Sequence, residues 1–400
     1  MSLLLPLQDA LEQMLAAAVA SSAVTQRPLL DALGLVLADD VVALIAVPGD
    51  DNSAMDGYAL RAAEVSAPLP VSQRIPAGSV GTVLQPGTAA RIFTGAAIPP
   101  GADAVVMQEN CERDGDLVTV SGPVTTGQNI RPRGQDIGVG ETALAAGRVL
   151  RAQDLGLLAS IGHATVSVHQ PLRVAVLSTG DELREPGSGE LHSGQLYNSN
   201  RYTLGGLLRS MNMEFVDCGI IADDPEATAH ALQKAAASAD VVITSGGVSV
   251  GEEDHVKNQV ERLGKLDLWK LAIKPGKPLA YGRIGDTPFI GLPGNPTSVF
   301  VTFNLVARPF LRKMQGITEP EAPALQATAA FTVNKPGARQ EYLRVSLQQS
   351  EQGLVASKFS NQSSGVLSSV SHSNALAVVP PGTVVAAGDS IQVLLLDLLT

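Results

Sequence analysis

The chain has 400 residues, of which 45% are hydrophobic and only 4% aromatic, and its formal net charge is −11. This length exceeds one ordinary domain, so we expect several domains with aliphatic cores. An isoelectric point near 5.0 argues against nucleic acid and anionic membranes as general partners. Any anionic ligand must therefore be bound by local cations and backbone dipoles. The two distant cysteines, Cys111 and Cys218, form neither a disulfide framework nor a zinc site.

The N-terminal segment is apolar but lacks the pattern of a secretory signal. No Lys or Arg precedes Arg27, and Asp9 and Glu12 interrupt the apolar run. Its apolar side chains instead fall on one helical stripe, formed by Leu7, Leu11, Met14, Leu15 and Ala18. No run approaches the roughly 18 residues that a membrane span needs. We expect an amphipathic helix here and a soluble, cytoplasmic protein.

Four domains are predicted. Residues 1–45 and 141–170 are expected to form a discontinuous helical and extended domain, in which a helix at 151–163 packs on the N-terminal helix. Residues 46–140 contain short β segments broken by Gly and Pro, typical of an inserted β-rich domain. Residues 171–318 alternate strands and helices, and residues 319–400 return to short β runs. We predict a doubly wound α/β domain with a parallel sheet, then a small C-terminal β-barrel, with a sandwich as the alternative.

The α/β segment predicts a ligand site. Strands are expected at 172–177, 214–220, 241–243, 266–272, 278–281 and 289–292. Helices are expected at 200–211, from Pro225 with Asp224 as N-cap, from about Glu252, and at 297–314. Polar or glycine-rich loops follow the strands, and ligands of such sheets bind beyond the carboxyl ends of the strands. These loops contain Asp181, Glu182, Asp223, Ser245, Gly246, Gly247, Pro293, Gly294 and Asn295.

Residues 241–296 have the pattern of an anion pocket. A strand, a glycine turn and a helix in succession present backbone N–H groups to an anion. Lys274 and Lys277 enclose a Pro-Gly pair, which fixes the direction of both ammonium groups. A second strand ends in the Pro293–Pro296 turn. We therefore predict a pocket for a phosphorylated or otherwise anionic ligand.

Carboxylates near this pocket allow two interpretations. Asp181, Glu182 and residues 252–254 supply the oxygen ligands that Mg²⁺ prefers. The alternative for residues 252–254 is a capping cluster in a first helical turn. The polar loops at 50–59 and 131–136 are likewise consistent with plain turns, and the residues alone favour a solvated turn for 131–136.

Eight blocks in fixed order resemble the molybdopterin molybdenumtransferase family, which includes bacterial MoeA and the gephyrin E domain. They are DNSAMDGYA, RIFTGAAIPPGADAVVMQE, RGQDI, STGDEL, SNRY, TSGGVSVGEEDHVK, WKLAIKPGKP and GLPGNPTS. The resemblance covers most of residues 51–298 and is weaker in the C-terminal domain. It implies a molybdopterin-binding α/β domain and an enzyme of molybdenum cofactor synthesis. Such an enzyme converts adenylyl-molybdopterin and molybdate to molybdenum-molybdopterin and AMP with Mg²⁺.

The resemblance also implies residue roles. The functionally sensitive positions are Asp56, Thr94, Asp136, Glu182, Asp223, Asp254, Lys270, Lys274, Lys277, Pro293 and Pro296. The residues expected to bind the cofactor and molybdate are Ser245, Gly246, Gly247, Ser249, Asn295, Arg344 and Ser364, together with Lys274 and Lys277. The Mg²⁺ ligands are Asp181, Glu182 and Asp254. Where some relatives have Ser-Ser-Arg, this chain has Ser363-Ser364-Gly365.

The resemblance further implies a homodimer whose site is shared between the two chains. It also implies two kinds of partner, an upstream adenylyltransferase and downstream molybdoenzymes. Two other functions are considered. The adenylyltransferase shares the α/β fold, but its glycine loop is Gly-Gly-Thr-Gly, whereas this chain has Gly246-Gly247-Val248-Ser249. A non-catalytic scaffold, a role that gephyrin also has, rests on that precedent alone.

Overall fold

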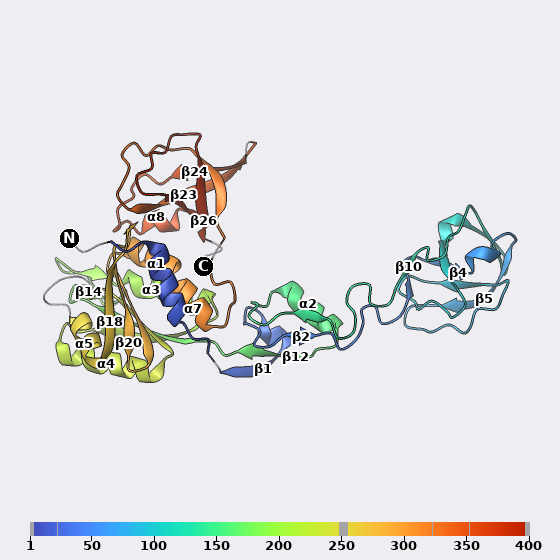
Figure 1. The fold of residues 1–400 in the computed structure, drawn as a ribbon, viewed down its shortest axis with the longest axis horizontal. Coiled ribbons are helices and arrows are strands. Elements are labelled where there is room, and N and C mark those ends of the chain that lie inside the picture. The colour runs from blue at the N-terminus through green and yellow to red at the C-terminus, as the bar shows by residue number, and fades with distance from the viewer. Residues whose placement is uncertain (1–3, 22, 248–254, 322, 352, 397–400) are drawn as a thin grey trace. The chain divides into compact units, whose positions relative to one another are not determined.

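The structure is a computed structural model that describes residues 4–21, 23–247, 255–321, 323–351 and 353–396 (Figure 1). The chain divides into two compact units. Unit one comprises Met1–Thr25, Gly34–Val36 and His169–Thr400, and unit two comprises Gln26–Leu33 and Leu37–Val168. Both cysteines are free thiols, as expected. Among the described residues no helix is long and apolar enough to cross a membrane.

Unit one is built on a six-stranded mixed sheet. In spatial order its strands are β16 (Glu214–Ile221), β13 (Arg173–Thr179), β17 (Val241–Ser245), β21 (Thr287–Leu292), β20 (Pro278–Ile284) and β18 (Gly264–Lys270). The first four are parallel, as predicted, but β20 and β18 are antiparallel to their neighbours. Residues 285–286 join β20 to β21, and a two-residue connection is too short for a crossover. The expectation of a wholly parallel sheet is therefore wrong at this edge.

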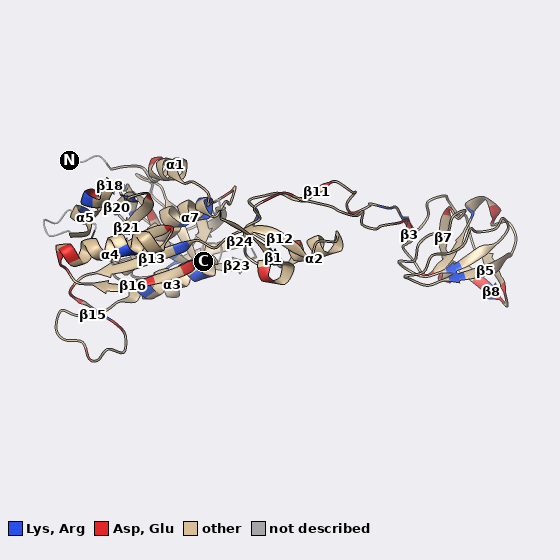
Figure 2. Ribbon diagram, turned by 90° about the horizontal axis from the view of Figure 1, so that it is seen from below, with Lys and Arg blue, Asp and Glu red and all other residues tan. Residues whose placement is uncertain are grey.

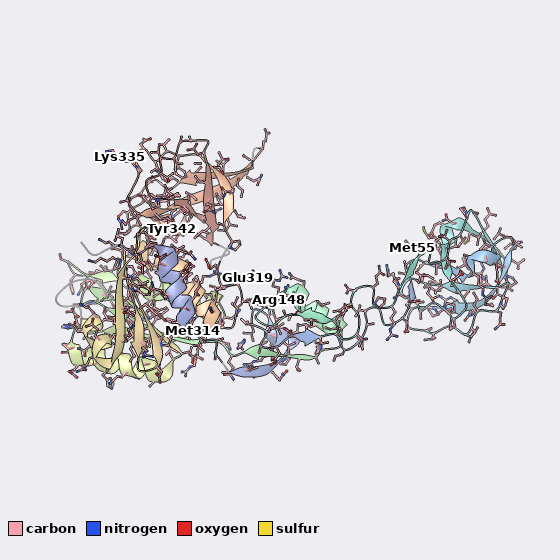
Figure 3. The ribbon with its side chains drawn as sticks, viewed as in Figure 1. Met55, Arg148, Met314, Glu319, Lys335 and Tyr342 are labelled. Carbon is pink, nitrogen blue, oxygen red and sulfur yellow. The ribbon has the colours of Figure 1, made fainter. Side chains whose placement is uncertain are left out.

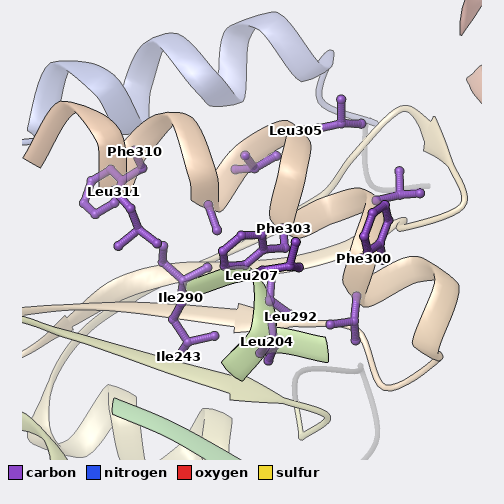
Figure 4. Close-up of a cluster of buried hydrophobic side chains, with 14 of the residues drawn as sticks. Leu204, Leu207, Ile243, Ile290, Leu292, Phe300, Phe303, Leu305, Phe310 and Leu311 are labelled. Carbon is purple, nitrogen blue, oxygen red and sulfur yellow. The ribbon is translucent and has the colours of Figure 1, made fainter. Parts of the chain in front are cut away.

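Helices cover both faces of this sheet. One face packs against α1 (Leu7–Ala17), α3 (Ser199–Ser210), α6 (Pro296–Thr302), η4 (Phe303–Ala307) and α7 (Arg308–Met314). The other face packs against α4 (Pro225–Ser238) and α5 (His255–Leu263). Alternate residues of each strand point to opposite faces, so Ile243 enters the first core and Val242 the second. Figure 4 shows Ile243 in the first core with Phe303 and Phe310.

Local signals fixed the helix boundaries. Asp224 Oδ1 accepts a hydrogen bond from Ala227 N at 2.8 Å, and Pro225 opens α4, which confirms the predicted cap. The helix predicted at 297–314 is present, but η4 is a π-helical turn in its middle. Pro309 has no N–H to donate, and its ring would clash with the carbonyl of Leu305 in a regular helix. Leu305 lies in the widened turn, which accommodates that clash.

The C-terminal part of unit one is a closed β-barrel, as predicted. Its strands are β22 (Leu325–Ala329), β23 (Gln340–Ser350), β24 (Gly353–Lys358), β25 (Ala375–Val379) and β26 (Ser390–Leu395), and β23–β25 pairing closes it. A short helix, α8 (Ser368–Ser371), follows β24. The two-residue strand β19 (Ile273–Lys274) pairs with β23 and joins the α/β domain to the barrel.

Unit two contains the predicted β-rich insertion. Its main sheet has the order β7 (Ala104–Met107), β4 (Gly57–Leu60), β6 (Ala89–Ile92), β5 (Leu69–Ile75), β9 (Leu117–Val120) and β8 (Cys111–Asp114). Short pairs join β3 (Asn52–Ser53) to β10 (Ile130–Arg131), and β2 (Val41–Val42) to β11 (Thr142–Leu144). β1 (Val24–Pro28) pairs with β12 (Thr165–His169). The remaining elements are α2 (Ala152–Ser160), β14 (Leu183–Arg184), β15 (Leu196–Tyr197), η1 (Leu29–Ala32), η2 (Ala62–Glu64) and η3 (Gln108–Asn110), with β14 and β15 in unit one.

The packing of two helices differs from expectation. The helix predicted at 151–163 is α2, which contacts η1 and β11. The N-terminal helix α1 instead packs on α7, and Ala10 and Met14 enter the first core of unit one. The sequence shows an apolar stripe on each helix but not which stripe faces which. The predicted domain boundaries remain predictions.

We expect Phe303→Ala to lower the free energy of unfolding of unit one by about 3–5 kcal/mol, because the ring is 0% exposed in the main core. Val19→Ala, at a side chain that is 77% exposed, is the matched control and should change stability little. Urea unfolding followed by circular dichroism measures both. Equal midpoints for the two variants would contradict this description of the core.

Candidate functional site

Three strand ends meet at the carboxyl edge of the main sheet. The chain leaves β13 for β16 on one side and then returns to β17 on the other. Such a reversal of winding separates the connecting helices and opens a crevice between the strand ends. A cleft of about 660 Å³ lies here. Its lining comprises Glu182, Leu183, Leu196, Asn198, Ser199, Asn200, Gly246, Gly247, Pro278, Pro293, Gly294, Asn295, Pro296, Ser298 and Gly365.

Gly246 turns the chain where β17 ends. Its φ is +89°, and an added Cβ would lie 3.1 Å from the carbonyl oxygen of Thr179. Gly246 N donates to Leu292 O at 3.1 Å, which ties the end of β17 to that of β21. A side chain at this position would strain the backbone and push on β13. The predicted glycine turn therefore lies where the ends of β13, β17 and β21 approach one another closely.

Asn200 holds the Pro293–Pro296 turn against α3. Its Nδ2 donates to Gly294 O at 2.8 Å. Asn198, two residues earlier, accepts from Arg201 N at 3.3 Å and caps α3. Both asparagines line the cleft. The start of α3 therefore shapes one wall, with polar groups that face the ligand space.

Three buried polar atoms near this edge have no hydrogen-bond partner within the described protein: Ser178 Oγ, Ser245 Oγ and Asn200 Oδ1. Ser178 and Ser245 are register partners on β13 and β17, so their hydroxyls lie on the same face of the sheet. A buried polar group without a partner costs free energy, and such groups commonly mark places that bind a ligand or ordered water. This edge is therefore suited to a polar ligand.

Glu182 lines the cleft, and both Glu182 and Asp181 beside it are exposed. The loop that follows is anchored by Arg201, which forms ion pairs with Glu185 at 2.5 Å and with Asp217. Both carboxylates raise the pKa of Arg201, that of Asp217 more strongly. Asp223 is exposed after β16 and lies 3.9 Å from His255 Nε2.

The metal site predicted from Asp181, Glu182 and Asp254 is only partly visible. Asp254 and Ser249 lie outside the described residues. Within the described part of the chain, no group of three or more His, Cys, Asp or Glu residues is arranged to hold a metal ion.

The three predicted lysines surround the 271–278 turn. Lys270 ends β18, and Lys274 Nζ lies 3.2 Å from Glu341 Oε1 of the barrel. Lys274 and Lys277 are exposed, and Pro278, next to Lys277, lines the cleft. Gly276, with φ +101°, has no room for a Cβ, which would lie 2.2 Å from Thr302 Oγ1. The turn is thus pressed onto the helix that begins at the cleft.

The barrel adds one wall through the loop of residues 361–366. Gly365 lines the cleft, and an added Cβ there would meet nothing within 4 Å. Thr297, the second residue of α6, donates from N to Ser364 O at 3.1 Å and from Oγ1 to Val366 O at 3.0 Å. The 361–366 loop has the sequence of an ordinary turn, but these hydrogen bonds show that it faces the α/β domain.

Arg344 supports this loop from within the barrel (its neighbour Tyr342 is labelled in Figure 3). The side chain is only 1% exposed and donates to Ser369 Oγ, Tyr342 O and Ser363 O at 3.1–3.3 Å. Burial lowers the pKa of Arg344 to about 10, against the opposing charge of Glu341. The guanidinium thus remains charged at neutral pH, and its hydrogen bond to Ser363 O holds the 361–366 loop.

In unit two the structure joins two of the predicted residues. Thr94 donates from N and Oγ1 to Asp56 Oδ1, both at 2.8 Å. These hydrogen bonds lower the pKa of Asp56. Asp136, also exposed, lies on the next loop, where its N–H donates to Val47 O at 2.9 Å.

Sequence reasoning missed four residues that shape the site: Ser178, Asn198, Asn200 and Thr297. Each lies at a strand end or a helix start, and those positions were predicted. Asn198 and Asn200 could have been identified from the sequence, because they lie at the predicted start of α3, where asparagine commonly caps a helix. The contact of Thr297 with residues 364–366 joins distant segments and has no local signal.

Comparisons with known proteins agree with this architecture. Residues 5–162 match the MoeA N-terminal region (domain I and II), residues 175–313 a probable molybdopterin binding domain, and residues 326–396 the MoeA C-terminal region (domain IV). Molybdopterin molybdenumtransferase of Haemophilus influenzae is 42% identical over 330 residues, covering 81% of each chain. Molybdopterin molybdenumtransferase 2 of Mycobacterium tuberculosis is 38% identical over 384 residues, covering 92% of this chain and 93% of that one.

The fold is shared with a solved structure. The MoeA molybdopterin biosynthesis protein of Pyrococcus horikoshii superposes with a TM-score of 0.87 at 31% identity, over 98% of this chain and 100% of that one. The chain therefore belongs to the MoeA family of multi-domain α/β and β proteins. It is an enzyme of the molybdopterin molybdenumtransferase type and acts in molybdenum cofactor biosynthesis.

Replacing Thr297 with Val should loosen the 361–366 loop. The isosteric change removes the Oγ1 donor and leaves Val366 O without that hydrogen bond, which costs about 1–3 kcal/mol. Hydrogen exchange of residues 361–366 should become faster. Thr297→Ser keeps the hydroxyl and is the control; exchange that is unchanged in both variants would show that this hydrogen bond does not hold the loop.

Proposed function

We propose that the chain inserts molybdenum from molybdate into adenylyl-molybdopterin and releases AMP in a Mg²⁺-dependent reaction. The observation that carries the proposal is the cleft at the β13 switch point, with two glycine-rich strand ends and three orphaned polar atoms beside it. Backbone N–H groups at such edges bind phosphate, and hydroxyl and amide groups suit the polar edge of a pterin. Relatives named molybdopterin molybdenumtransferase supply the substrate class.

Each part of the substrate has proposed contacts. Ser245, Gly246, Gly247 and Asn295 bind the pterin phosphate region, in a pocket shaped by Lys270, Pro293 and Pro296. Lys274, Lys277 and Ser249 hold the molybdate oxyanion, and Glu341 orients Lys274. Arg344 adds positive charge from beneath the 361–366 loop, with Ser364 on its surface. Asp223 follows the end of β16, at the carboxyl edge of the main sheet.

The donor set at the cleft fits Mg²⁺ in its chemistry. Asp181 and Glu182 offer adjacent carboxylates, and Glu182 lines the cleft. With Asp254 they would hold the ion, which when bound polarises the phosphate oxygens and favours departure of AMP. The protein's own contribution is to neutralise the oxyanion with the lysines and to align the pyrophosphate with backbone N–H groups.

The experiment is to supply adenylyl-molybdopterin and molybdate and to measure AMP. Lys274→Ala should reduce molybdate-stimulated AMP release by about a hundredfold, because a cation beside the reacting oxyanion is lost. Lys335→Ala, an exposed lysine of the barrel, is the control and should match the wild type. Consumption of ATP with free molybdopterin would instead identify an adenylyltransferase, and no turnover of either kind would favour a scaffold.

We further propose a cytoplasmic homodimer in which Asp56, Thr94 and Asp136 of one copy complete the site of the other. Support comes from the Asp56–Thr94 pair, an exposed and ordered polar site in unit two. The dimer would receive its substrate from an adenylyltransferase and deliver its product to molybdoenzymes.

Mixing two inactive variants tests this shared site. Asp56→Ala and Lys274→Ala should each be inactive as purified dimers, whereas coexpressed chains should recover AMP release in mixed dimers that contain one intact site. Light scattering measures the oligomeric state in parallel. If the mixture stays inactive although mixed dimers form, Asp56 and Lys274 do not act in one site across two copies.

A further inference from the structure

A stack of cations and aromatic rings lies on the surface of unit two beside Asp56 and Thr94. The guanidinium carbons of Arg74 and Arg91 each lie 4.6 Å from the ring centroid of Phe93. Arg91 also lies 5.3 Å from the ring centroid of Tyr58. Arg74 lies on β5, Tyr58 on β4 and Arg91 on β6, and Phe93 directly follows β6. Figure 2 shows basic segments beside the label of β5.

Arg91 is fixed in place. It donates to Gly57 O at 2.8 Å, to Ile92 O at 3.4 Å and to Gln108 Oε1 at 2.6 Å. A guanidinium has five N–H donors, so Nε and one further N–H of Arg91 are not used in these bonds. Arg74 is exposed, and its guanidinium carbon lies over the ring of Phe93.

Neither arginine is neutralised by an ion pair among the described residues. Asp56 interacts electrostatically with Arg91, and Glu109 accepts from Gln108 Nε2 at 3.1 Å. Asp56 Oδ1 is already occupied by Thr94. Two unpaired guanidiniums on one ring are unusual in a chain with a net charge of −11, because most of its surface repels anions.

We propose that the Arg74–Phe93–Arg91 stack binds the nucleoside monophosphate part of the substrate. The phosphate accepts from the unused N–H groups of Arg91 and from Arg74, since guanidinium forks match phosphate oxygens. The base stacks on the outer face of Arg74, because Arg pairs well with planar rings on either face. This assignment rests on the proposed function, in which AMP is the leaving group. It adds binding residues that neither the resemblance nor the comparisons supplied.

The stack explains the choice of residues at position 93. An aliphatic side chain would bury the same strand edge but would offer no aromatic ring to attract the two guanidiniums. The ring thereby orients both cations before a ligand arrives, which reduces the side-chain entropy lost on binding. The site is specific for a ligand that has both a ring and a phosphate.

The test is titration of the full-length protein with AMP, inorganic phosphate and adenosine, followed by calorimetry. Wild-type protein should bind AMP more tightly than either fragment. Arg74→Gln should weaken AMP binding about tenfold or more, and Arg74→Lys should be intermediate, because it keeps the charge but loses the plane. Phe93→Leu should weaken AMP binding while leaving the net charge unchanged.

Arg113→Gln is the matched control. Arg113 is an exposed arginine of β8 in the same sheet, bound only to Gly115 O at 2.9 Å among the hydrogen bonds described. It removes the same charge and should leave AMP binding at the wild-type level. Circular dichroism and melting temperature verify that every variant is folded; Arg74 and Arg113 are exposed positions on strands.

The outcomes separate this inference from the proposed function. If Arg74→Gln and Arg113→Gln bind AMP alike, or if adenosine or phosphate binds as tightly as AMP, the stack is not the nucleotide site. In that case AMP release by the wild type still supports the proposed function. If the wild type releases no AMP with molybdate but loses AMP affinity on Arg74→Gln, the nucleotide site stands and the proposed reaction does not.

Discussion

The opposite winding of the chain on the two sides of β13 is the constraint on which the site depends. It brings the ends of β13, β17 and β21 to one edge without helices between them. The three ends approach so closely that only glycine fits at position 246, where a Cβ would press on Thr179 O. A larger side chain at this position is therefore excluded, and the backbone itself forms the edge of the cleft. The buried hydroxyls of Ser178 and Ser245 lie at the ends of the neighbouring strands and have no hydrogen-bond partner among the described residues.

The barrel extends this edge through few but buried contacts. Arg344 is a buried cation whose recorded hydrogen-bond acceptors are all neutral, which is costly, because desolvation disfavours the charged form. Replacing it with an apolar residue would remove that cost but also the donor that fixes Ser363 O. Together with Thr297, it determines where Gly365 meets the cleft. Gly365 has no side chain where some relatives have the arginine of Ser-Ser-Arg, so this residue offers only backbone atoms to the cleft.

Much of the α/β core followed from local signals. Asp224-Pro225 began a helix, apolar runs became strands, and glycine turns lay at their carboxyl ends, because these features depend on a few neighbouring residues. The reversed direction of β20 was missed, since it depends on the two-residue turn to β21 rather than on strand composition; β18, antiparallel to β20, runs in the same direction as the four parallel strands. The partner of α1 was missed because an apolar stripe does not identify what it faces. Contacts such as Thr297 with Val366, or Arg74 with Phe93, join segments that only the folded chain brings together.

In an acidic chain, cations that are to attract an anion must be held in place locally, and the two units hold theirs differently. Unit one has a tightly packed turn that bears Lys274 and Lys277, and the buried Arg344, which donates to Ser363 O. Unit two places its arginines on an aromatic ring, where the charge stays exposed but its direction is fixed. Buried or oriented charges are less screened by salt and lose less entropy than mobile surface lysines. The net charge of −11 then raises discrimination, because anions that reach neither arrangement are repelled by the rest of the surface.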